Sequence, residues 1–489
     1  MLPTWGLPLG DTALAIHLVV AIGFAIRLIY RKLNITMTLA WILVIVFLPI
    51  VGLVLYWMFG SRKLGRRREK LGTRIRDHYL KTYQITEEAI EPEEIDTDEH
   101  FTDLARALYA MTGFKPIEGN KIHLLTSDAE IFAKMIEDIE AAENTVFAEF
   151  YIVDPKGLPE DMLEAMERAA GRGVDVKLLA DAIGSRPFFK SGWPDRLERA
   201  GVDVETSLGV SLIKSVSKRT DLRNHRKILV VDQTIGYIGS CNLTDPELFK
   251  PDDGHWVDLM ARVQGPFAES LSVVLAADFL YDKVGGDFTK SDLSEFPTES
   301  IHPRTRGPAV AQLVPSGPEM GTSVIYEAII SVVFAATDRI MITTPYFVPD
   351  DALMMALANA CRRGVEVTIV VPADVDSVMV HYASAAAFDD LLAAGVRIAR
   401  FHGGMLHTKA LLVDDEVSFV GTVNMDMRSF HLNLEITMIV YDEAFNSEMQ
   451  GVVEMYLEQS DFIDEEEFAR RSNLTRFKEN VFRLVSPLL

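Results

Sequence analysis

Residues 225–242 read HRKILVVDQTIGYIGSCN, and residues 407–424 read HTKALLVDDEVSFVGTVN. In both stretches a lysine follows the histidine by two positions, an aspartate by seven, a glycine by fourteen and an asparagine by seventeen. Agreement at so many spaced positions indicates an internal duplication. The chain is therefore expected to hold two copies of one structural unit.

Each copy predicts a strand, a turn and a second strand. Residues 228–231 and 410–413 are apolar and suit buried strands, and residues 235–238 and 417–420 suit the strands that follow. Because side chains alternate along a strand, the histidine and lysine point to one face. Imidazole suits nucleophilic or acid–base chemistry, and an ammonium group suits phosphate oxygens. Neither copy has the cysteine or carboxylate cluster of a metal site.

The repeated pattern resembles the HxKxxxxDxxxxxxGSxN motif of the phospholipase D superfamily. The resemblance implies an α/β fold with two repeats, each of mixed strands flanked by helices, that form one pseudo-twofold catalytic body and require no cofactor. The catalytic candidates that it implies are His225, Lys227, Asp232, His407, Lys409 and Asp414. Within this set the resemblance favours a structural role for the two aspartates.

The phosphate-binding or orienting candidates come from the ends of the motifs and from two later acids. They are Ser240, Asn242, Thr422, Asn424, Asp258 and Glu435. Each of the two acids follows a motif on an apolar, strand-like run, where an unpaired charge is costly. Each acid either orients a histidine, as in a catalytic triad, or forms a structural salt bridge.

The surroundings of the motifs also repeat. Residues 146–153, 174–180 and 202–205 predict strands in the first half, and residues 340–348, 365–371 and 396–401 predict their counterparts. Helices are expected over 159–170 and 351–361. Tyr151 corresponds to Tyr346. This alternation indicates one α/β sheet per half, and family resemblance implies that the two halves pack face to face.

The N-terminus differs sharply from the rest of the chain. Residues 12–30 are apolar apart from His17 and Arg27, and residues 37–59 carry no charge. About 20 apolar residues cross a bilayer, so a two-helix transmembrane hairpin is expected over 1–60. Basic residues cluster just after the second span, which places the remainder in the cytoplasm. The segment resembles the anchor of some bacterial phospholipase D-type synthases.

The expected domains are therefore the hairpin (1–60), a basic and then acidic juxtamembrane linker (61–119), a first repeat (120–297) and a second repeat (298–489). A short amphipathic helix is expected over 101–111 within the linker. Residues 211–223 form a basic insertion before the first motif, which either holds an anionic headgroup or is a surface loop.

Composition limits the partners and the compartment. The net charge of −23 disfavours nucleic acid as a partner. The only cysteines are Cys241 and Cys361, one in each repeat, which argues against a disulfide framework. Cys241 lies inside the first motif and is read as a small packed residue.

The hairpin, the basic segment and the tail of the second motif, residues 424–435, together resemble bacterial cardiolipin synthase. That family condenses two phosphatidylglycerol molecules through a phosphohistidine, so phosphatidylglycerol and anionic membrane lipid are the expected partners at the bacterial inner membrane. The resemblance favours His225 as nucleophile and His407 as acid. The alternatives are a membrane-bound phospholipase D or transphosphatidylase, a phosphatidylserine synthase, a tethered nuclease and a lipid-binding protein without activity. A homodimer is left open.

Overall fold

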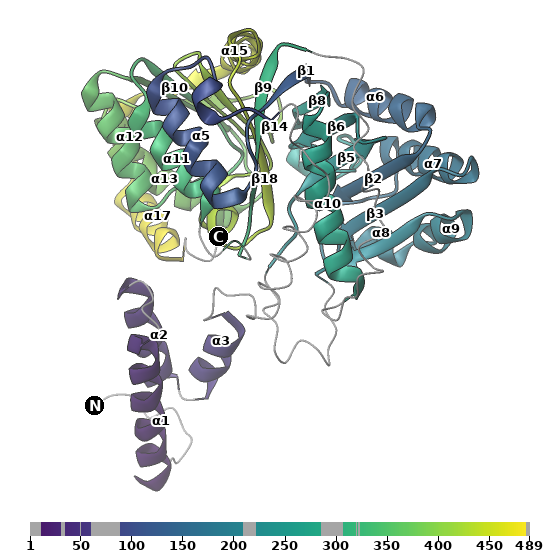
Figure 1. Cartoon of the computed structure of the whole chain (residues 1–489). Coiled ribbons are helices and arrows are strands. Elements are labelled where there is room, and N and C mark those ends of the chain that lie inside the picture. The colour runs from purple at the N-terminus through teal and green to yellow at the C-terminus, as the bar shows by residue number, and fades with distance from the viewer. Residues whose placement is uncertain are drawn as a thin grey trace. The chain divides into compact units, whose positions relative to one another are not determined.

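The computed structural model describes residues 11–30, 35–48, 50–59, 89–208, 222–284, 307–318, 320 and 323–485. The chain divides into two compact units, residues 1–64 with 211–221, and residues 65–210 with 222–489 (Figure 1). Most of the basic linker (60–88) and of the basic insertion (209–221) falls outside the described residues.

The described residues of the N-terminal unit form the helices α1 (Asp11–Tyr30), α2 (Ile35–Phe47) and α3 (Val51–Phe59). The expectation of one continuous helix over 37–59 is wrong. Ile50 has a φ of 63°, which lies outside the helical region. The sequence reason is Pro49, because proline lacks the N–H that a helix interior needs and clashes with the preceding turn.

Aromatic packing holds these helices together. Tyr56 on α3 makes edge contacts with Phe24 and Trp41, with ring centroids 5.4 Å apart in both pairs. Apolar side chains such as Val19 and Phe47 remain exposed on the outside. No helix among the described residues is both long and apolar enough to cross a membrane.

The second unit contains the two repeats. The elements of the first repeat are β1 (Ile117–Leu125), α6 (Asp128–Ala141), β2 (Thr145–Phe150), α7 (Leu158–Gly171), β3 (Asp175–Asp181), α8 (Arg186–Lys190), α9 (Trp193–Ala200), β4 (Asp203–Ser207), β5 (Lys227–Val231), β6 (Ile235–Gly239), η3 (Pro251–Asp253), β7 (Trp256–Val257), β8 (Met260–Gln264) and α10 (Phe267–Val284). The predicted strands and helix of this half are confirmed.

The second repeat follows the same order. Its elements are β9 (Ala309–Ser316), α11 (Val324–Ala335), β10 (Arg339–Thr343), β11 (Phe347–Val348), α12 (Asp351–Arg363), β12 (Glu366–Pro372), α13 (Val378–Ala393), β13 (Arg397–Phe401), β14 (Met405–Leu406), β15 (Ala410–Val413), β16 (Val417–Gly421), β17 (Met425–Asp426), α14 (Met427–His431), β18 (Glu435–Val440), α15 (Glu443–Glu458), β19 (Ser460–Phe462), α16 (Glu465–Ala469) and α17 (Asn473–Val485).

Most of the described strands form one continuous sheet in the order β19-β13-β12-β10-β15-β16-β18-β9-β1-β8-β6-β5-β2-β3-β4, while β11 pairs with β17 and β14 with β7 in two small sheets. The order reads almost the same from either end, because β9, β18, β16, β15, β10, β12 and β13 correspond to β1, β8, β6, β5, β2, β3 and β4. The expectation of a separate sheet in each half is wrong, since β1 and β9 pair antiparallel and join the halves. The duplication itself is confirmed by this order.

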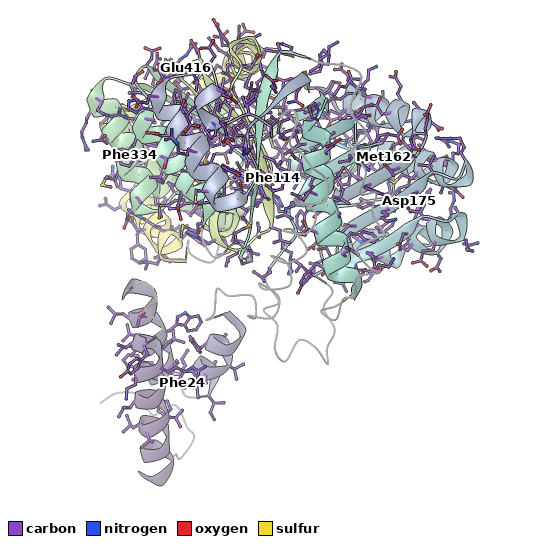
Figure 2. The ribbon with its side chains drawn as sticks, viewed as in Figure 1. Phe24, Phe114, Met162, Asp175, Phe334 and Glu416 are labelled. Carbon is purple, nitrogen blue, oxygen red and sulfur yellow. The ribbon has the colours of Figure 1, made fainter. Side chains whose placement is uncertain are left out.

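Helices cover both faces of each half-sheet (Figure 1). The outer faces carry α6, α7 and α9 in the first repeat, and α11, α12 and α13 in the second. On the inner faces α10 packs on the first half-sheet and also touches β9, while α15 packs on the second and also touches β1. Figure 2 shows the dense side-chain packing of this body, with Phe114 and Met162 inside it.

The predicted amphipathic helix at 101–111 is confirmed as α5 (Glu99–Thr112), which follows η1 (Pro92–Glu94). Its assignment to a linker is wrong. Phe101, Leu104 and Leu108 are buried in the same apolar cluster as Ile329 of α11. The helix therefore belongs to the core of the second repeat, because its apolar face is covered there.

Candidate active site

Both motifs fold as hairpins that bring their two ends to one edge. In the first, β5 pairs with β6 so that Ile228 lies opposite Ile238, and in the second Ala410 lies opposite Val420. The residues flanking these pairs are therefore brought together: the histidine and lysine from one strand, and the Gly-Ser or Gly-Thr from the other.

The backbone of each histidine is bound to the opposite repeat. The N–H of His225 donates to the carbonyl of Leu434 at 2.9 Å, and the N–H of His407 donates to the carbonyl of Val257, also at 2.9 Å. Leu434 and Val257 directly precede Glu435 and Asp258. Each backbone contact thus sets an acid from one repeat beside the histidine of the other.

The side chains of the two histidines also pair with acids of the opposite repeat. Nδ1 of His225 lies 2.9 Å from Oε2 of Glu435. Nδ1 of His407 lies 2.7 Å from Oδ1 of Asp258. Since a carboxylate only accepts, Nδ1 carries the proton in both rings and Nε2 is the nitrogen left for chemistry. The sequence places each acid after the motif of its own repeat, yet the structure pairs it with the histidine of the other.

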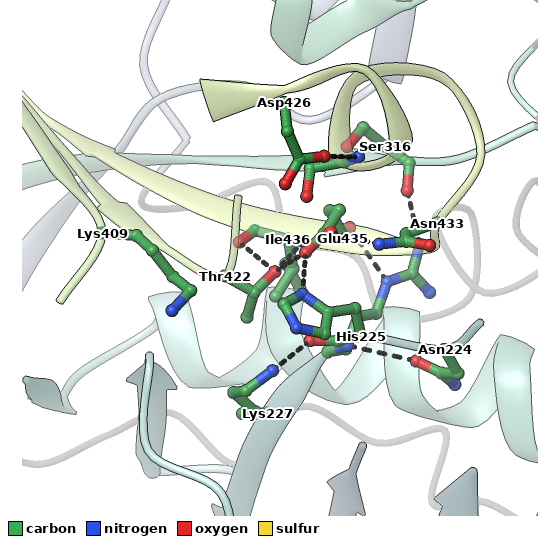
Figure 3. A network of polar contacts seen from close by, with 12 residues as sticks. Asn224, His225, Lys227, Ser316, Lys409, Thr422, Asp426, Asn433, Glu435 and Ile436 are labelled. Atoms are coloured by element: carbon green, nitrogen blue, oxygen red, sulfur yellow. Dashed lines mark hydrogen bonds and ion pairs between the residues drawn. The ribbon is translucent and has the colours of Figure 1, made fainter. Parts of the chain in front are cut away.

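The motif hydroxyls hold these acids. Oγ1 of Thr422 donates to Oε2 of Glu435 at 2.6 Å, and Nδ2 of Asn433 donates to Oε1 of the same carboxylate at 3.1 Å (Figure 3). Oγ of Ser240 donates to Oδ1 of Asp258 at 2.5 Å. Ser240 and Thr422 therefore lie where they orient the acids.

These bonds keep both acids ionised inside the protein. Burial acts to raise the pKa of Asp258, but His407, Lys409 and the Ser240 hydroxyl together outweigh it and lower that pKa to about 2. Burial likewise opposes ionisation of Glu435, and the contacts with His225 lower its pKa below the ordinary value. Two buried anions therefore face the two imidazoles.

The two lysines are buried and bind alike. Nζ of Lys227 donates to the carbonyl of His225 at 2.7 Å, and Nζ of Lys409 donates to the carbonyl of His407 at 2.5 Å. Burial lowers the pKa of Lys227 to about 8 and lowers that of Lys409 well below its usual range. Each ammonium group has further N–H donors for an anion.

The two motifs share one site. The charge of Lys409 acts on the pKa of His225, and the charge of Lys227 acts on the pKa of His407. Figure 3 shows Lys409 of the second repeat beside Lys227 and His225 of the first. The two imidazole–ammonium sets therefore converge, as the resemblance implies.

The two imidazoles share the same protonation tendency. Burial, the largest cause, lowers the pKa of His225 to about 4 and that of His407 to about 4. Acid–base chemistry needs one protonated and one neutral ring. The near-symmetric environment does not give the two rings different pKa values. The negative charge of a bound phosphodiester would raise the pKa of a nearby ring and so favour the protonated state that the acid needs.

The two asparagines lie at the ends of the motifs. Oδ1 of Asn242 accepts from the N–H of Ile152 at 3.2 Å. The side chain of Asn424 bonds to Asp426, and its buried Oδ1 has no hydrogen-bond partner among the described residues. One amide oxygen at the site is thus available to a donor of a ligand.

Asp232 and Asp414 are not brought to the imidazoles, which corrects their inclusion among catalytic candidates. The carboxylate of Asp232 accepts from the backbone N–H groups of Asn144 and Thr145, and that of Asp414 accepts from those of Asp338 and Arg339. Six residues of largely extended chain lie between each aspartate and its histidine, a span of roughly 20 Å. The structural role that the resemblance favours is confirmed.

The same turn recurs at both aspartates. Asp232 and Gln233 have φ values of 48° and 55°, and Asp414 and Asp415 have 52° and 60°. Two consecutive residues with positive φ make the type I′ turn that joins tight hairpins. Aspartate tolerates this conformation and also ties down the neighbouring loop.

Sequence analysis missed two aromatic rings. Tyr151 lies edge-on to His225 with ring centroids 5.0 Å apart, and Trp256 lies 4.6 Å from the ring of His407. The matching positions of Tyr151 and Tyr346 were the available signal for the first. Trp256 stands two residues before Asp258, but a single tryptophan in an apolar run carries no such signal.

Cys241 is confirmed as a packed residue. Its thiol is buried, and burial raises its pKa well above the usual value, which disfavours a nucleophilic thiolate. One oxygen of Asp128, one of Asp258 and the Cys241 sulfur lie within 4.8 Å of one another. Burial and the charge of Asp258 raise the pKa of Asp128 to about 7.

A pseudo-twofold α/β body with one His–Lys set from each half defines a phospholipase D-like protein. A family model described as "Cardiolipin synthase, PLD-like domain" matches residues 135–259 and 329–456, and one described as "Phospholipase_D-nuclease N-terminal" matches residues 19–61. The fold resembles the crystal structure of phosphatidylserine synthase from Haemophilus influenzae, with a TM-score of 0.58 and 15% identity over 79% of this chain and 100% of that one.

Among curated relatives, the protein is 39% identical to cardiolipin synthase A of Erwinia tasmaniensis over 476 residues, which cover 96% of each chain. It is 38% identical to cardiolipin synthase A of Serratia proteamaculans over the same share of both chains. The chain belongs to the cardiolipin synthase family.

Proposed function

We propose that the protein is a cardiolipin synthase, which transfers the phosphatidyl group of one phosphatidylglycerol to a hydroxyl of another and releases glycerol. The observation that carries the proposal is the exchanged pair of histidine–acid contacts. They orient two imidazoles at one site, and two buried ammonium groups accompany them. Family membership supports the choice of substrate.

The reaction is a double displacement. Nε2 of one histidine attacks the phosphorus of phosphatidylglycerol, so a P–N bond forms as the P–O bond to glycerol breaks. The second imidazole, protonated, gives its proton to the departing glycerol oxygen. It then accepts the proton of a hydroxyl on the second phosphatidylglycerol, whose oxygen attacks phosphorus as the P–N bond breaks.

We assign the nucleophile to His225 and the acid to His407. The assignment follows the family resemblance. A further carboxyl group lies near each acid, Asp128 near Asp258 and Asp426 near Glu435. The energy of the diester bond is kept in the P–N bond, so no nucleotide is consumed.

The remaining polar groups stabilise the charge that develops. Lys227 and Lys409 each retain donors for the non-bridging oxygens of phosphorus, where negative charge builds in the transition state. The Asn424 oxygen suits a hydroxyl of the glycerol headgroup, since it has no other donor among the described residues. Tyr151 and Trp256 limit the access of water to the two rings.

We also propose that the hairpin of residues 1–60 anchors the protein in the bacterial inner membrane, with the catalytic body in the cytoplasm. The apolar side chains exposed on α1 and α2 support this placement. The family model matched at residues 19–61 supports a shared role for this segment.

The purified protein and phosphatidylglycerol alone test the proposal. We expect cardiolipin and glycerol in equal amounts. Phosphatidic acid without cardiolipin would instead indicate a phospholipase D. Phosphatidylserine formed only when serine and an activated lipid are supplied would indicate a phosphatidylserine synthase.

A further inference from the structure

The C-terminal helix α17 exposes an apolar stripe. Leu474, Phe477, Val481 and Leu484 are 65%, 66%, 42% and 81% exposed. Their spacing of three, four and three residues places them on one face of the helix. A contiguous apolar face on the surface of a soluble body usually marks a contact with another surface.

The opposite face fixes the helix on the body. Phe482 stacks on Tyr382 of α13, with ring centroids 5.3 Å apart and an interplanar angle of 9°. Glu479 is buried and accepts from Arg471 at 3.0 Å. The exposure of the stripe is therefore set by firm packing behind it.

The charges of α17 itself are mostly basic. Lys478 is exposed at the edge of the stripe, and Arg476 and Arg483 lie on the same helix, with Arg483 3.4 Å from Asp351. The only acid of α17 is Glu479, which faces inward. An apolar face bordered by cations suits a surface of anionic lipid, although the protein as a whole is strongly acidic.

The helix lies beside the rim of the active site. Phe482 and Tyr346 both pack against the apolar cluster of Val348, Val380 and Ala383, and the hydroxyl of Tyr346 donates to Asp376 at 2.7 Å. Lys250 also bonds to Asp376 at 2.7 Å, and its Nζ lies 5.5 Å from the ring of Trp256. Trp256 in turn contacts His407, so a short chain of contacts joins α17 to the reacting histidine.

The apolar surface continues toward that rim. Val378 and Met379, at the start of α13, are 67% and 41% exposed. They directly precede Val380, which packs with Phe482 of α17. The stripe and these two residues thus adjoin the apolar cluster against which Tyr346 packs.

We propose that the exposed face of α17 docks on the bilayer and holds the active site at the level of the lipid headgroups. The inference rests on the proposed function, because the phosphodiester of a phospholipid lies at that level while its acyl chains stay in the bilayer. An interfacial helix buries its apolar face about 5–10 Å into the lipid. Docking of α17 thereby fixes the orientation of the catalytic body relative to the bilayer, in addition to the anchor proposed for residues 1–60.

A fluorescent label reports the contact directly. A full-length Cys361→Ser variant carries Leu484→Cys, labelled with an environment-sensitive dye, in phosphatidylglycerol–phosphatidylethanolamine vesicles with brominated acyl chains; Cys241 is buried and remains. We expect bromine to quench about half of the label's emission, as for an apolar face at the acyl-chain boundary. Emission equal to that in unbrominated vesicles would overturn the inference.

Phe334→Cys is the matched control. Phe334 is a 43% exposed apolar residue of α11 (Figure 2). It stands three residues before Thr337, whose N–H binds Asp414 at the far end of the second motif from His407. A label there should keep its full emission, and equal quenching at both sites would mean that the dye itself partitions into lipid.

Activity gives a second readout. Phe477→Glu should lower cardiolipin formation in long-chain vesicles about tenfold, because an apolar contact with lipid is lost, and should leave turnover of short-chain phosphatidylglycerol in detergent unchanged. Phe334→Glu should change neither.

Equal activity of Phe477→Glu in vesicles, or a shift from dimer to monomer with no quenching at residue 484, would overturn the inference. Wild type that forms no cardiolipin would refute the proposed function, whereas quenching would still report on α17.

Discussion

The two half-sites of this protein agree in four contacts and differ in two neighbours. In both, the histidine is bound to the other repeat through its backbone and its Nδ1, the lysine binds its own histidine carbonyl, and a hydroxyl holds the acid. The residue between histidine and lysine, however, is buried Arg226 in one and Thr408 in the other. Asp128 also lies near Asp258, whereas Asn433 and Asp426 accompany Glu435.

The comparison teaches which contacts of a duplicated site stay fixed and which neighbours vary. Both rings need an acid that orients Nδ1 and an Nε2 that is left for the reaction. The contacts that the two half-sites share provide both. One ring must also begin protonated. A further carboxyl group lies near each acid, Asp128 near Asp258 and Asp426 near Glu435, so the two halves are alike in this respect. The negative charge of a bound phosphodiester would then supply the proton affinity that the acid needs.

The largest effect is expected when either imidazole is removed. His225→Ala and His407→Ala should each lower cardiolipin formation by at least about 10³-fold, since covalent and acid–base catalysis are lost. A phosphatidyl ester of p-nitrophenol separates the two, because its leaving group needs no proton. His407→Ala should still release one equivalent of nitrophenol in a burst, and His225→Ala should release none. A burst in His225→Ala would reverse the assignment.

The acids test whether the exchange between repeats is functional. Glu435→Gln and Asp258→Asn should each lower kcat by about 10²–10⁴-fold, because the histidine loses its tautomer. With the nitrophenyl ester, Glu435→Gln should behave like His225→Ala, and Asp258→Asn like His407→Ala. The opposite pattern would mean that each acid serves the histidine of its own repeat.

Replacing Arg226 and replacing Thr408 should have different effects on the stability of the protein. The Arg226 guanidinium pairs with Asp278 and donates to the carbonyl of Glu435 at 3.0 Å. Arg226→Met should cost about 3–5 kcal/mol of unfolding free energy, because it leaves a largely buried carboxylate unpaired.

Thr408→Val is the matched change, and it should cost about 1 kcal/mol. It removes the 3.0 Å hydrogen bond between Thr408 and Tyr456 and the 3.4 Å hydrogen bond from Thr408 to the carbonyl of Val257. Urea denaturation measures both variants, and equal losses would show that the two half-sites are supported alike.

A smaller effect concerns pH. The folded pKa of about 4 for His225 lies below the unfolded value of 6.5, so the unfolded chain binds a proton first as pH falls. The contribution of the neutral His225 ring to the free energy of unfolding is complete above pH 6.5. As the pH falls toward 4, up to about 3 kcal/mol of it is lost. His225→Gln should remove this loss, and His407→Gln an equal one. The quantity to measure is the difference in unfolding free energy between each variant and wild type as a function of pH, because the raised pKa of Asp128 acts oppositely in the same range. A difference that does not change with pH would contradict the presence of buried neutral rings.

Much of the site could be predicted because its information is local. The motif residues lie within eighteen positions of one another, and their order in a hairpin fixes which ends meet. Asp258 and Glu435 were recognisable as charged residues on apolar strands. The repeat order of helices and strands follows from the same local patterns.

The remaining features depend on contacts far apart in the chain. His225 and Glu435 are 210 positions apart, and no local pattern indicates that acids are exchanged. The pairing of β1 with β9, which makes one sheet of two, and the burial of α5 against α11 are equally non-local. The interruption near Ile50 had a visible signal in Pro49, but proline inside an apolar run does not by itself decide between a bend and a break.

A structure of the protein with vanadate bound tests the central claim most directly, because vanadate adopts the five-coordinate geometry of phosphoryl transfer. The account predicts one vanadium between Nε2 of His225 and Nε2 of His407, with Lys227 and Lys409 on its equatorial oxygens and both Nδ1–carboxylate contacts intact. Vanadate held by one repeat alone, with the other histidine in a separate pocket, would contradict it.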